Sequence, residues 1–349
     1  MNIEGEVARH ASGEAGASEE GAARAARGAP DEERKSPDAA RASYDVVVVG
    51  GGPAGLAAGA FCGRKFLRTA VLEGDTWGGV LTRWCPDKRI DNYPGQRPGI
   101  QAGELAGYLL DDARRARVDL IEERVDGISR DLEVQAGGRR LRGTVLILAT
   151  GSTAAEAEIV GEKEFAAPGR GVHYAVRTPS HFRGCNVVVV GGGDTAVSAV
   201  ERLRGIAARI TLVHRQQTLR AVDGLTGDAK AGDGIDVALR CAVEAIFGGS
   251  CVKGVRVKNL GTGEERCIPA DAVVLAVGRR PNTAIFRDLD LAIDAKGQIE
   301  ADFWQRTSVR GILAVGDVSS PLKMIVTAVG QAAAAAHEAY REVRSPYWK

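Results

Sequence analysis

The chain has 349 residues, with 46 Lys and Arg against 45 Asp and Glu, a formal net charge of +1. This near-balance argues against a surface that binds nucleic acid or an anionic membrane. Hydrophobic residues make up 44% and charged residues 26%, which excludes disorder throughout, and no apolar run approaches the roughly 18 residues of a membrane span. The start also lacks a secretory signal pattern, so the sequence predicts a cytoplasmic protein.

Residues 1–43 are rich in Ala, Gly, Glu and Arg and contain no aromatic residue. This composition predicts a disordered tail, to which no role is assigned. A transit peptide would be poor in acids, and this segment is not. The remaining chain is long enough for two domains of ordinary size.

A strand, a glycine turn and a helix follow one another from Asp45. The apolar run 46–49 is typical of a parallel strand buried on both faces, and it leads into a glycine-rich turn and an Ala-rich helix. Backbone N–H groups at a helix N-terminus bind a pyrophosphate when no Cβ blocks its approach, and Gly50, Gly52 and Gly55 meet that need.

A second apolar run, 69–72, ends in Glu73, which follows Gly50 by 23 residues. This is near the spacing at which an acidic residue accepts two ribose hydroxyls. Such a carboxylate would repel a 2′-phosphate, so the first unit suits FAD or NAD and not NADP.

The same design recurs at the strand 186–190, the glycine turn 191–193, a helix over 197–203 and the strand 210–213. The position of Glu73 is taken here by His214, followed by Arg215, so the two units should hold different nucleotides. Arg215 and Arg220 could pair with a 2′-phosphate, which favours NADPH at the second site. Two further buried strands, 144–148 and 274–277, also end in glycine turns.

Taken together, these stretches resemble the two-dinucleotide-domain flavoproteins, and within them the low-molecular-weight thioredoxin reductase-like group. The resemblance covers residues 44–340. The matching stretches are GGGPAGLAAGA at 50–60, GGVLT at 78–82, IDNYPG at 90–95, ATG at 149–151, GGGDTAV at 191–197, HRQQTLRA at 214–221, GRRPN at 278–282 and ILAVGD at 312–317.

The resemblance implies an α/β fold of two Rossmann-like three-layer domains. The FAD-binding domain would be split into residues 44–152 and 283–349, with an NAD(P)H-binding domain at 153–282 inserted between the two parts. It also implies a homodimer.

Cofactor-binding residues carry over position by position. At FAD the resemblance places Gly50, Gly52, Pro53, Ala54, Gly55, Glu73, Gly79, Leu81, Thr82, Asn92, Val125, Thr150, Gly151, Gly316, Asp317, Lys323, Met324 and Ile325. At the nicotinamide dinucleotide it places Gly191, Gly193, Asp194, Thr195, Ala196, His214, Arg215, Arg220 and Gly278. For His214 and Arg220 the alternative is a solvated surface residue. Gln216 stands where NADPH binders of the group often have a second Arg, so NADH remains possible.

The departures from the group concern electron transfer. Thioredoxin reductases carry a redox C-x-x-C in the second domain, because electrons leave the flavin through a dithiol. The corresponding positions here are Ala175 and Thr178. The six cysteines are scattered, without a C-x-x-C pair or a metal-like grouping, and are interpreted as reduced structural thiols; Cys185 is the nearest to the missing pair.

Within the group, the chain therefore most resembles the ferredoxin–NADP⁺ reductase-like members. The residues that carry this resemblance are His173-Tyr174 and the segment 323–325. Those members usually have a longer C-terminal extension with an aromatic residue over the flavin. The terminal Tyr347 or Trp348 could supply one, and the alternative is a frayed end. A basic pair at Arg279 and Arg280 could meet an acidic partner, but the prediction is a solvated turn.

The function predicted is an FAD-dependent NAD(P)H oxidoreductase that passes electrons to ferredoxin, flavodoxin, a quinone or another non-dithiol acceptor. Two alternatives stay open. One is a disulfide or thiol reductase with an atypical thiol such as Cys185 or Cys85, and the other is a flavin-binding protein without turnover. No metal is expected and no catalytic residue is named, because the cofactors carry the chemistry of hydride transfer.

Overall fold

The computed structural model describes residues 41–219 and 234–345. The predicted tail up to residue 40, Arg220, Tyr347 and Trp348 lie outside these residues. In the described part no helix is long and apolar enough to cross a membrane.

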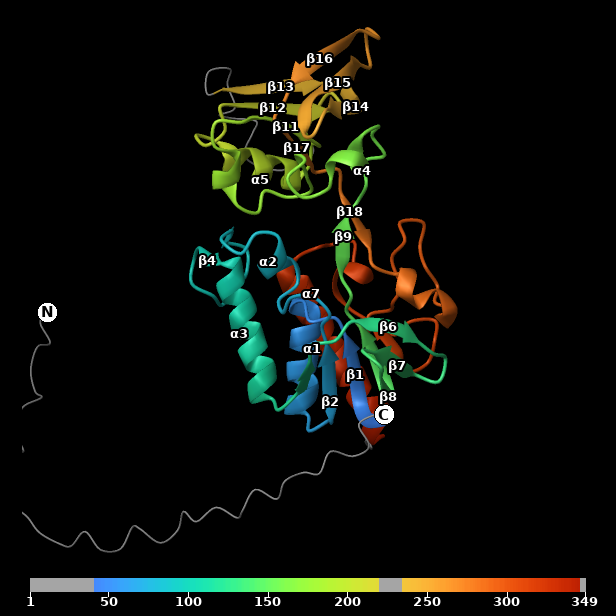
Figure 1. Cartoon of the computed structure of the whole chain (residues 1–349). Coiled ribbons are helices and arrows are strands. Elements are labelled where there is room, and N and C mark those ends of the chain that lie inside the picture. Colours follow the sequence, from blue (N-terminus) through green and yellow to red (C-terminus); the bar gives the residue numbers. More distant parts are fainter. Residues whose placement is uncertain (1–40, 220–233, 346–349) are drawn as a thin grey trace, which may run out of the picture. The chain divides into compact units, whose positions relative to one another are not determined.

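The larger of the two main sheets in the described residues has seven strands, in the order β5-β2-β1-β8-β7-β6, with β19 also paired to β8 (Figure 1). Strands β5, β2, β1, β8 and β19 run parallel, and β6 and β7 add an antiparallel edge. The strands are β1 (Arg41–Val49), β2 (Thr69–Leu72), β5 (Asp119–Ile121), β6 (Val125–Ile128), β7 (Glu133–Ala136), β8 (Arg139–Leu148) and β19 (Ile312–Ala314).

The alternation of side chains along β1 explains how this sheet is covered. Val46 and Val48 point to one face and pack against helices α1 (Pro53–Arg64) and α7 (Ile325–Arg344). Val47 and Val49 point to the other face, where η2 (Ala284–Leu289) packs. Because both faces are covered, β1 is a continuous apolar run, as expected for a parallel strand. Helix α3 (Ala102–Arg115) packs beside α1.

A second sheet of five described strands is entirely parallel, in the order β10-β17-β11-β12-β13. Helix α5 (Asp194–Leu203) covers one face, and the three-stranded antiparallel sheet β14-β15-β16 covers the other, which makes three layers. The strands are β10 (Val172–His173), β11 (Asn186–Val190), β12 (Arg209–His214), β13 (Ile235–Leu239), β14 (Cys241–Gly248), β15 (Val252–Asn259), β16 (Glu265–Pro269) and β17 (Ala272–Leu275).

The chain passes between the two large sheets twice. It leaves β8 through β9 (Ser152–Ala154) and returns from β17 through β18 (Arg279–Pro281), and these two strands pair antiparallel. We call β9 and β18 the crossing strands. The short elements that remain are β3 (Arg89–Ile90), β4 (Ile100–Gln101), α2 (Val80–Arg83), α4 (Glu162–Phe165), η1 (Pro179–Phe182) and η3 (Gly316–Val318).

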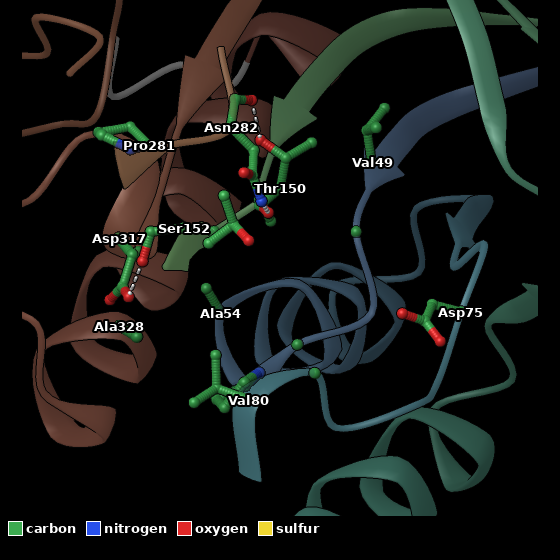
Figure 2. Close-up of a pocket in the computed structure, with 18 of the residues that line it drawn as sticks. Val49, Ala54, Asp75, Val80, Thr150, Ser152, Pro281, Asn282, Asp317 and Ala328 are labelled. Carbon is green, nitrogen blue, oxygen red and sulfur yellow. Dashed lines mark hydrogen bonds between the residues drawn. The ribbon is translucent and has the colours of Figure 1, made fainter. Parts of the chain in front are cut away.

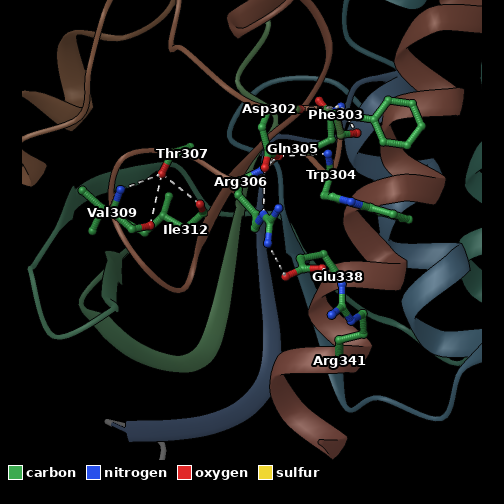
Figure 3. Close-up of polar contacts among 10 residues, drawn as sticks. All are labelled: Asp302, Phe303, Trp304, Gln305, Arg306, Thr307, Val309, Ile312, Glu338 and Arg341. Atoms are coloured by element: carbon green, nitrogen blue, oxygen red, sulfur yellow. Dashed lines mark hydrogen bonds and ion pairs between the residues drawn. The ribbon is translucent and has the colours of Figure 1, made fainter. Parts of the chain in front are cut away.

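A polar network attaches the loop before β19 to helix α7 (Figure 3). The Glu338 carboxylate is 5% exposed, and its oxygens lie 3.2 Å from Nη1 of Arg341 and 3.8 Å from Nη1 of Arg306. Asp302 accepts a 2.8 Å hydrogen bond from Nε of Arg306. The network therefore holds the segment that leads into β19 against the helix.

These elements confirm the α/β class and the strand–turn–helix units expected at 46–60 and 186–203. Several boundaries differ. The helix expected over 197–203 begins at Asp194, and the strand expected over 274–277 is β17, Ala272–Leu275. Strand β1 begins at Arg41, because the long strand β8 offers pairing partners from Arg140 onwards, so residues 41–43 belong to the sheet and not to the predicted tail.

Candidate functional site

The first glycine turn contains glycines of two kinds. Gly50 has φ +110°, and a Cβ there would lie 2.4 Å from the carbonyl oxygen of Ala149. A Cβ on Gly55 would lie 1.7 Å from the oxygen of Gly50. By contrast, a Cβ on Gly52, the N-cap of α1, would enter open space. Gly50 and Gly55 therefore close the turn, while Gly52 leaves room in front of the helix N-terminus.

The Glu73 carboxylate at the end of β2 is fixed by backbone donors. Its Oε2 accepts a 2.7 Å hydrogen bond from the N–H of Gly51, and its Oε1 accepts one of 2.9 Å from the N–H of Asp75. Each oxygen keeps a second lone pair for a hydroxyl donor. The acid is therefore bound to the glycine turn and also available to a ligand.

A cavity of about 900 Å³ opens in front of this turn (Figure 2). Fifteen of the residues expected at FAD line it, from both parts of the chain that flank the second sheet: Gly50, Gly52, Pro53, Ala54, Glu73, Gly79, Leu81, Val125, Thr150, Gly151, Gly316, Asp317, Lys323, Met324 and Ile325. The volume lies within the range of ligand-binding pockets. The open space at Gly52 and the carboxylate of Glu73 fit a dinucleotide.

Three expected residues do not line this cavity. Gly55 faces the backbone of Gly50, and the Thr82 hydroxyl donates to the carbonyl oxygens of Trp77 and Gly79, at 2.8 and 3.1 Å. Asn92 lies exposed after β3. Gly55 and Thr82 therefore shape the wall from behind. For these three residues, contact with FAD stays a prediction.

Two pairs of hydrogen-bonded side chains join distant segments at the cavity wall (Figure 2). The Thr150 hydroxyl donates to the carbonyl oxygen of Asn282, and the Asn282 amide donates to that of Thr150, both at 2.9 Å. Ser152 donates a 2.6 Å hydrogen bond to Oδ2 of Asp317. These bonds close the cavity between the end of β8 and the returning chain.

Sequence reasoning missed Trp84 and Ser152, which both line the cavity. Ser152 directly follows the matching stretch ATG, and Trp84 lies two residues after the end of GGVLT; this proximity was the available signal. Arg279 was expected in a solvated turn. That expectation is wrong, because the Arg279 side chain is only 16% exposed and its guanidinium lies 4.2 Å from the centroid of the Trp84 ring.

Two cations at this end of the cavity are partly desolvated. Burial lowers the pKa of Arg279, opposed by the nearby Asp317 carboxylate. Burial also lowers the pKa of Lys323, again opposed by Asp317, and the Lys323 ammonium donates a 3.2 Å hydrogen bond to the carbonyl oxygen of Arg279. The wall therefore carries positive charge close to one carboxylate.

The second glycine turn repeats the geometry of the first. Gly191 has φ +146°, and a Cβ there would lie 2.3 Å from the oxygen of Ala276; a Cβ on Gly193 would meet open space. His214 is buried, and its ring would lie 2.4 Å from a Cβ on Gly192, so it supports the turn much as Glu73 supports the first.

The other residues expected at the second site divide by exposure. Asp194, Thr195, Arg215 and Gly278 are exposed. The Ala196 side chain is fully buried in the core beneath α5, so any contact of this residue with a cofactor would be through its backbone.

Ring and hydrogen-bond contacts hold residues 173–174, in the segment where the resemblance places the redox dithiol. Burial lowers the pKa of His173, helped by the positive charges of His181 and Arg177, and its ring packs edge-on against Phe182 at 4.8 Å. Tyr174 donates a 2.9 Å hydrogen bond to Glu162. Burial and this bond raise the pKa of Tyr174 to about 12.

The six cysteines are all free thiols. Burial raises the pKa of Cys62 to about 12, and burial also raises the pKa of Cys85 and of Cys185. A raised thiol pKa opposes formation of the thiolate, which is the reactive form.

A mostly parallel sheet and an entirely parallel one, each with a glycine turn at the start of a helix, define a protein with two dinucleotide-binding units. A sequence model of the pyridine nucleotide-disulphide oxidoreductase family matches residues 44–339, and the chain belongs to this family.

The relatives agree with this assignment. The thioredoxin reductase of Treponema pallidum (strain Nichols) is 35% identical over 301 residues, which cover 85% of this chain and 96% of that protein. The structure of Lactococcus lactis thioredoxin reductase in its FR conformation is similar at a TM-score of 0.81 and 32% identity, covering 87% of this chain and 100% of the other. The T. acidophilum thioredoxin reductase gives a TM-score of 0.78 at 29% identity, covering 85% and 98%.

The chain is accordingly an FAD-dependent NAD(P)H oxidoreductase with the two-domain Rossmann-like fold, and its family uses FAD and NADPH.

Proposed function

We propose that this enzyme takes hydride from NAD(P)H and passes the electrons to an acceptor that is not a dithiol, such as ferredoxin, flavodoxin or a quinone. The observation that carries the proposal is the pair Ala175 and Thr178, where the related reductases are expected to have their redox cysteines. Bound FAD would accept the electrons of NAD(P)H and pass them on to the acceptor.

The proposed FAD site is the cavity described above. The Gly50–Gly52 turn and the N-terminus of α1 would hold the pyrophosphate, Glu73 the adenosine ribose, and Asp317 a hydroxyl of the ribityl chain. The corresponding domain division, 44–152 with 283–349 for FAD and 153–282 for NAD(P)H, is part of this proposal, as is the homodimer.

The proposed nicotinamide dinucleotide site is the second glycine turn. Gly193 leaves space in front of α5 for the pyrophosphate, and the exposed Arg215 would pair with a 2′-phosphate. A carboxylate at the end of the second strand, as Glu73 is in the first unit, would repel that phosphate. The second unit has His214 there instead. These features favour NADPH over NADH.

The charge of the segment that replaces the dithiol supports an acidic protein as acceptor. Between Glu164 and Asp194 the chain contains no Asp or Glu. Arg177, His181 and Arg183 are exposed within seven residues of one another on and beside η1. Ferredoxins and flavodoxins are acidic, so opposite charge would guide them to this surface.

The second candidate function is reduction of a disulfide through an atypical thiol. It is favoured by the relatives, which are named thioredoxin reductases. Cys85, beside the cavity residue Trp84, and Cys185, nearest to the missing pair, are the thiols it would use.

The test is anaerobic stopped-flow measurement of flavin absorbance after mixing with NADPH and, separately, NADH. We expect rapid bleaching with NADPH. The reduced enzyme is then offered ferredoxin, flavodoxin, a quinone and a disulfide, and only the first three should reoxidise it. The double variant C85S/C185S should behave as the wild type. Disulfide reduction that this variant abolishes would favour the second candidate, and a flavin that neither nucleotide bleaches would contradict both.

A further inference from the structure

Arg279 occupies an unusual position for an arginine in a short surface strand. It is the first residue of β18, yet its side chain is largely buried and its guanidinium stacks on Trp84. A desolvated guanidinium requires compensating partners, since a buried cation without them is costly.

The partners form a chain of hydrogen bonds from Arg279 through Ser152 to Asp317, which we call the relay. Nε of Arg279 donates a 2.7 Å hydrogen bond to Oγ of Ser152, and Nη2 donates to the Ser152 carbonyl oxygen. Ser152 Oγ in turn donates its proton to Oδ2 of Asp317, at 2.6 Å, and Nε of Arg279 lies 3.7 Å from the same oxygen. The relay thus occupies Oδ2 and fixes the rotamer of Asp317.

The relay spans parts of the chain that are distant in sequence. Arg279 and Ser152 belong to the two crossing strands, Trp84 follows α2, and Asp317 lies in η3. Trp84, Ser152 and Asp317 line the cavity, and Arg279 stands behind them. One guanidinium therefore connects the crossing strands to two walls of the cavity.

We propose that Arg279 is a positioning residue, which fixes Asp317 and Trp84 for FAD and couples the crossing strands to the flavin site. The inference rests on the proposed FAD site. Lysine could not replace Arg279, because a single ammonium group cannot lie over the indole ring and also donate to both Oγ and the carbonyl oxygen of Ser152, as Nε and Nη2 do.

The experiment titrates FAD into the apoprotein of the wild type, R279A, R279K, S152A and the control R266A, an exposed arginine of β16. We expect R279A to weaken FAD binding about tenfold, the size of a lost charge-assisted hydrogen bond, and to change the visible spectrum of the bound flavin. R279K should restore affinity only partly, and R266A should match the wild type. The double variant R279A/S152A should bind no more weakly than R279A alone, because both remove the same relay.

Wild-type affinity and an unchanged flavin spectrum in R279A would overturn the proposal. So would independent, additive losses in R279A and S152A. If R279A does not fold, S152A tests the proposal in its place. It removes one hydroxyl from the relay and should weaken FAD binding several-fold. A wild-type protein that binds no FAD would instead contradict the proposed function, and this outcome is distinct from the others.

Discussion

At the scale of single residues, Gly52 and Gly55 share one turn but face different surroundings. The Cβ position of Gly55 is filled by the backbone of Gly50, whereas that of Gly52 is open and lies at the cavity. One glycine therefore permits the fold, and the other permits the approach of a ligand.

We expect G55A to lower the free energy of unfolding by about 3 kcal/mol, because the added methyl group overlaps a backbone oxygen. G52A should change it by less than about 1 kcal/mol, while FAD affinity falls at least about tenfold because the methyl group occupies the place of the pyrophosphate. Urea denaturation of the apoproteins and FAD titration measure the two effects. Equal effects of the two substitutions on both quantities would contradict this division.

At the scale of elements, helix α7 is held to the loop before β19 by a buried carboxylate. Glu338 is almost fully buried and pairs with Arg341 (Figure 3). Glu342, one turn later, pairs with Arg310, whose side chain is 88% exposed. Helix α7 therefore contributes a glutamate to two Glu–Arg ion pairs, one with a buried carboxylate and one that is largely exposed.

We expect E338Q to lower the free energy of unfolding by about 2 kcal/mol, since it leaves the buried end of Arg341 without its charged partner. E342Q is the matched control and should cost less than about 1 kcal/mol, because exposed pairs contribute little. Urea denaturation of the wild type and of both variants measures the two losses of stability. A control that costs as much as E338Q would show that burial is not the cause.

The β10–η1 segment should make the fold sensitive to acid. Burial and the neighbouring His181 and Arg177 lower the pKa of His173 below its ordinary 6.5. Between the folded-state pKa and 6.5, the unfolded chain binds the proton and the folded chain does not, so stability falls as the pH falls through this window. Above it both states are neutral and His173 has no effect.

Replacing this histidine by Asn should therefore flatten the loss of stability between pH 7 and pH 5, measured by urea denaturation at half-unit steps. The difference between H173N and the wild type should be constant above pH 7. If the two proteins lose stability in parallel below pH 6.5, His173 is not the group responsible.

At the scale of the whole molecule, the near-neutral net charge conceals a local excess of positive charge. The acid-free stretch between Glu164 and Asp194 concentrates exposed Arg177 and Arg183 on one segment. Local charge of this kind acts on the rate of association with a charged partner.

We expect the double variant R177E/R183E to reduce kcat/KM for ferredoxin or flavodoxin at least about tenfold at low ionic strength, with a smaller difference at high salt. Turnover with an uncharged quinone should not change. R266E, a charge reversal on β16, is the control. Equal losses with the quinone and the acidic carriers would contradict docking at this segment.

Prediction from the sequence succeeded where a feature is local. The two strand–turn–helix units and Glu73 at the end of β2 follow from short patterns in the sequence. The other residues expected at FAD came from the resemblance to a known family, and fifteen of the expected residues line the cavity. It failed where neighbours in space decide. Arg279 was expected in a solvated turn, but Trp84 and Ser152, which are distant in sequence, contact its guanidinium.

The sequence by itself determined the α/β class, two nucleotide-binding units with different residues at the end of their second strands, and the absence of sulfur at Ala175 and Thr178. These depend on side-chain alternation, glycine sterics and residue type, which act over a few residues. Only the tertiary structure decided the burial and the partners of Arg279, because Ser152 is 127 residues away and the pairing of the crossing strands brings them together. Burial, which is set by the whole fold, placed an arginine expected in solvent against the cavity residues Trp84 and Ser152.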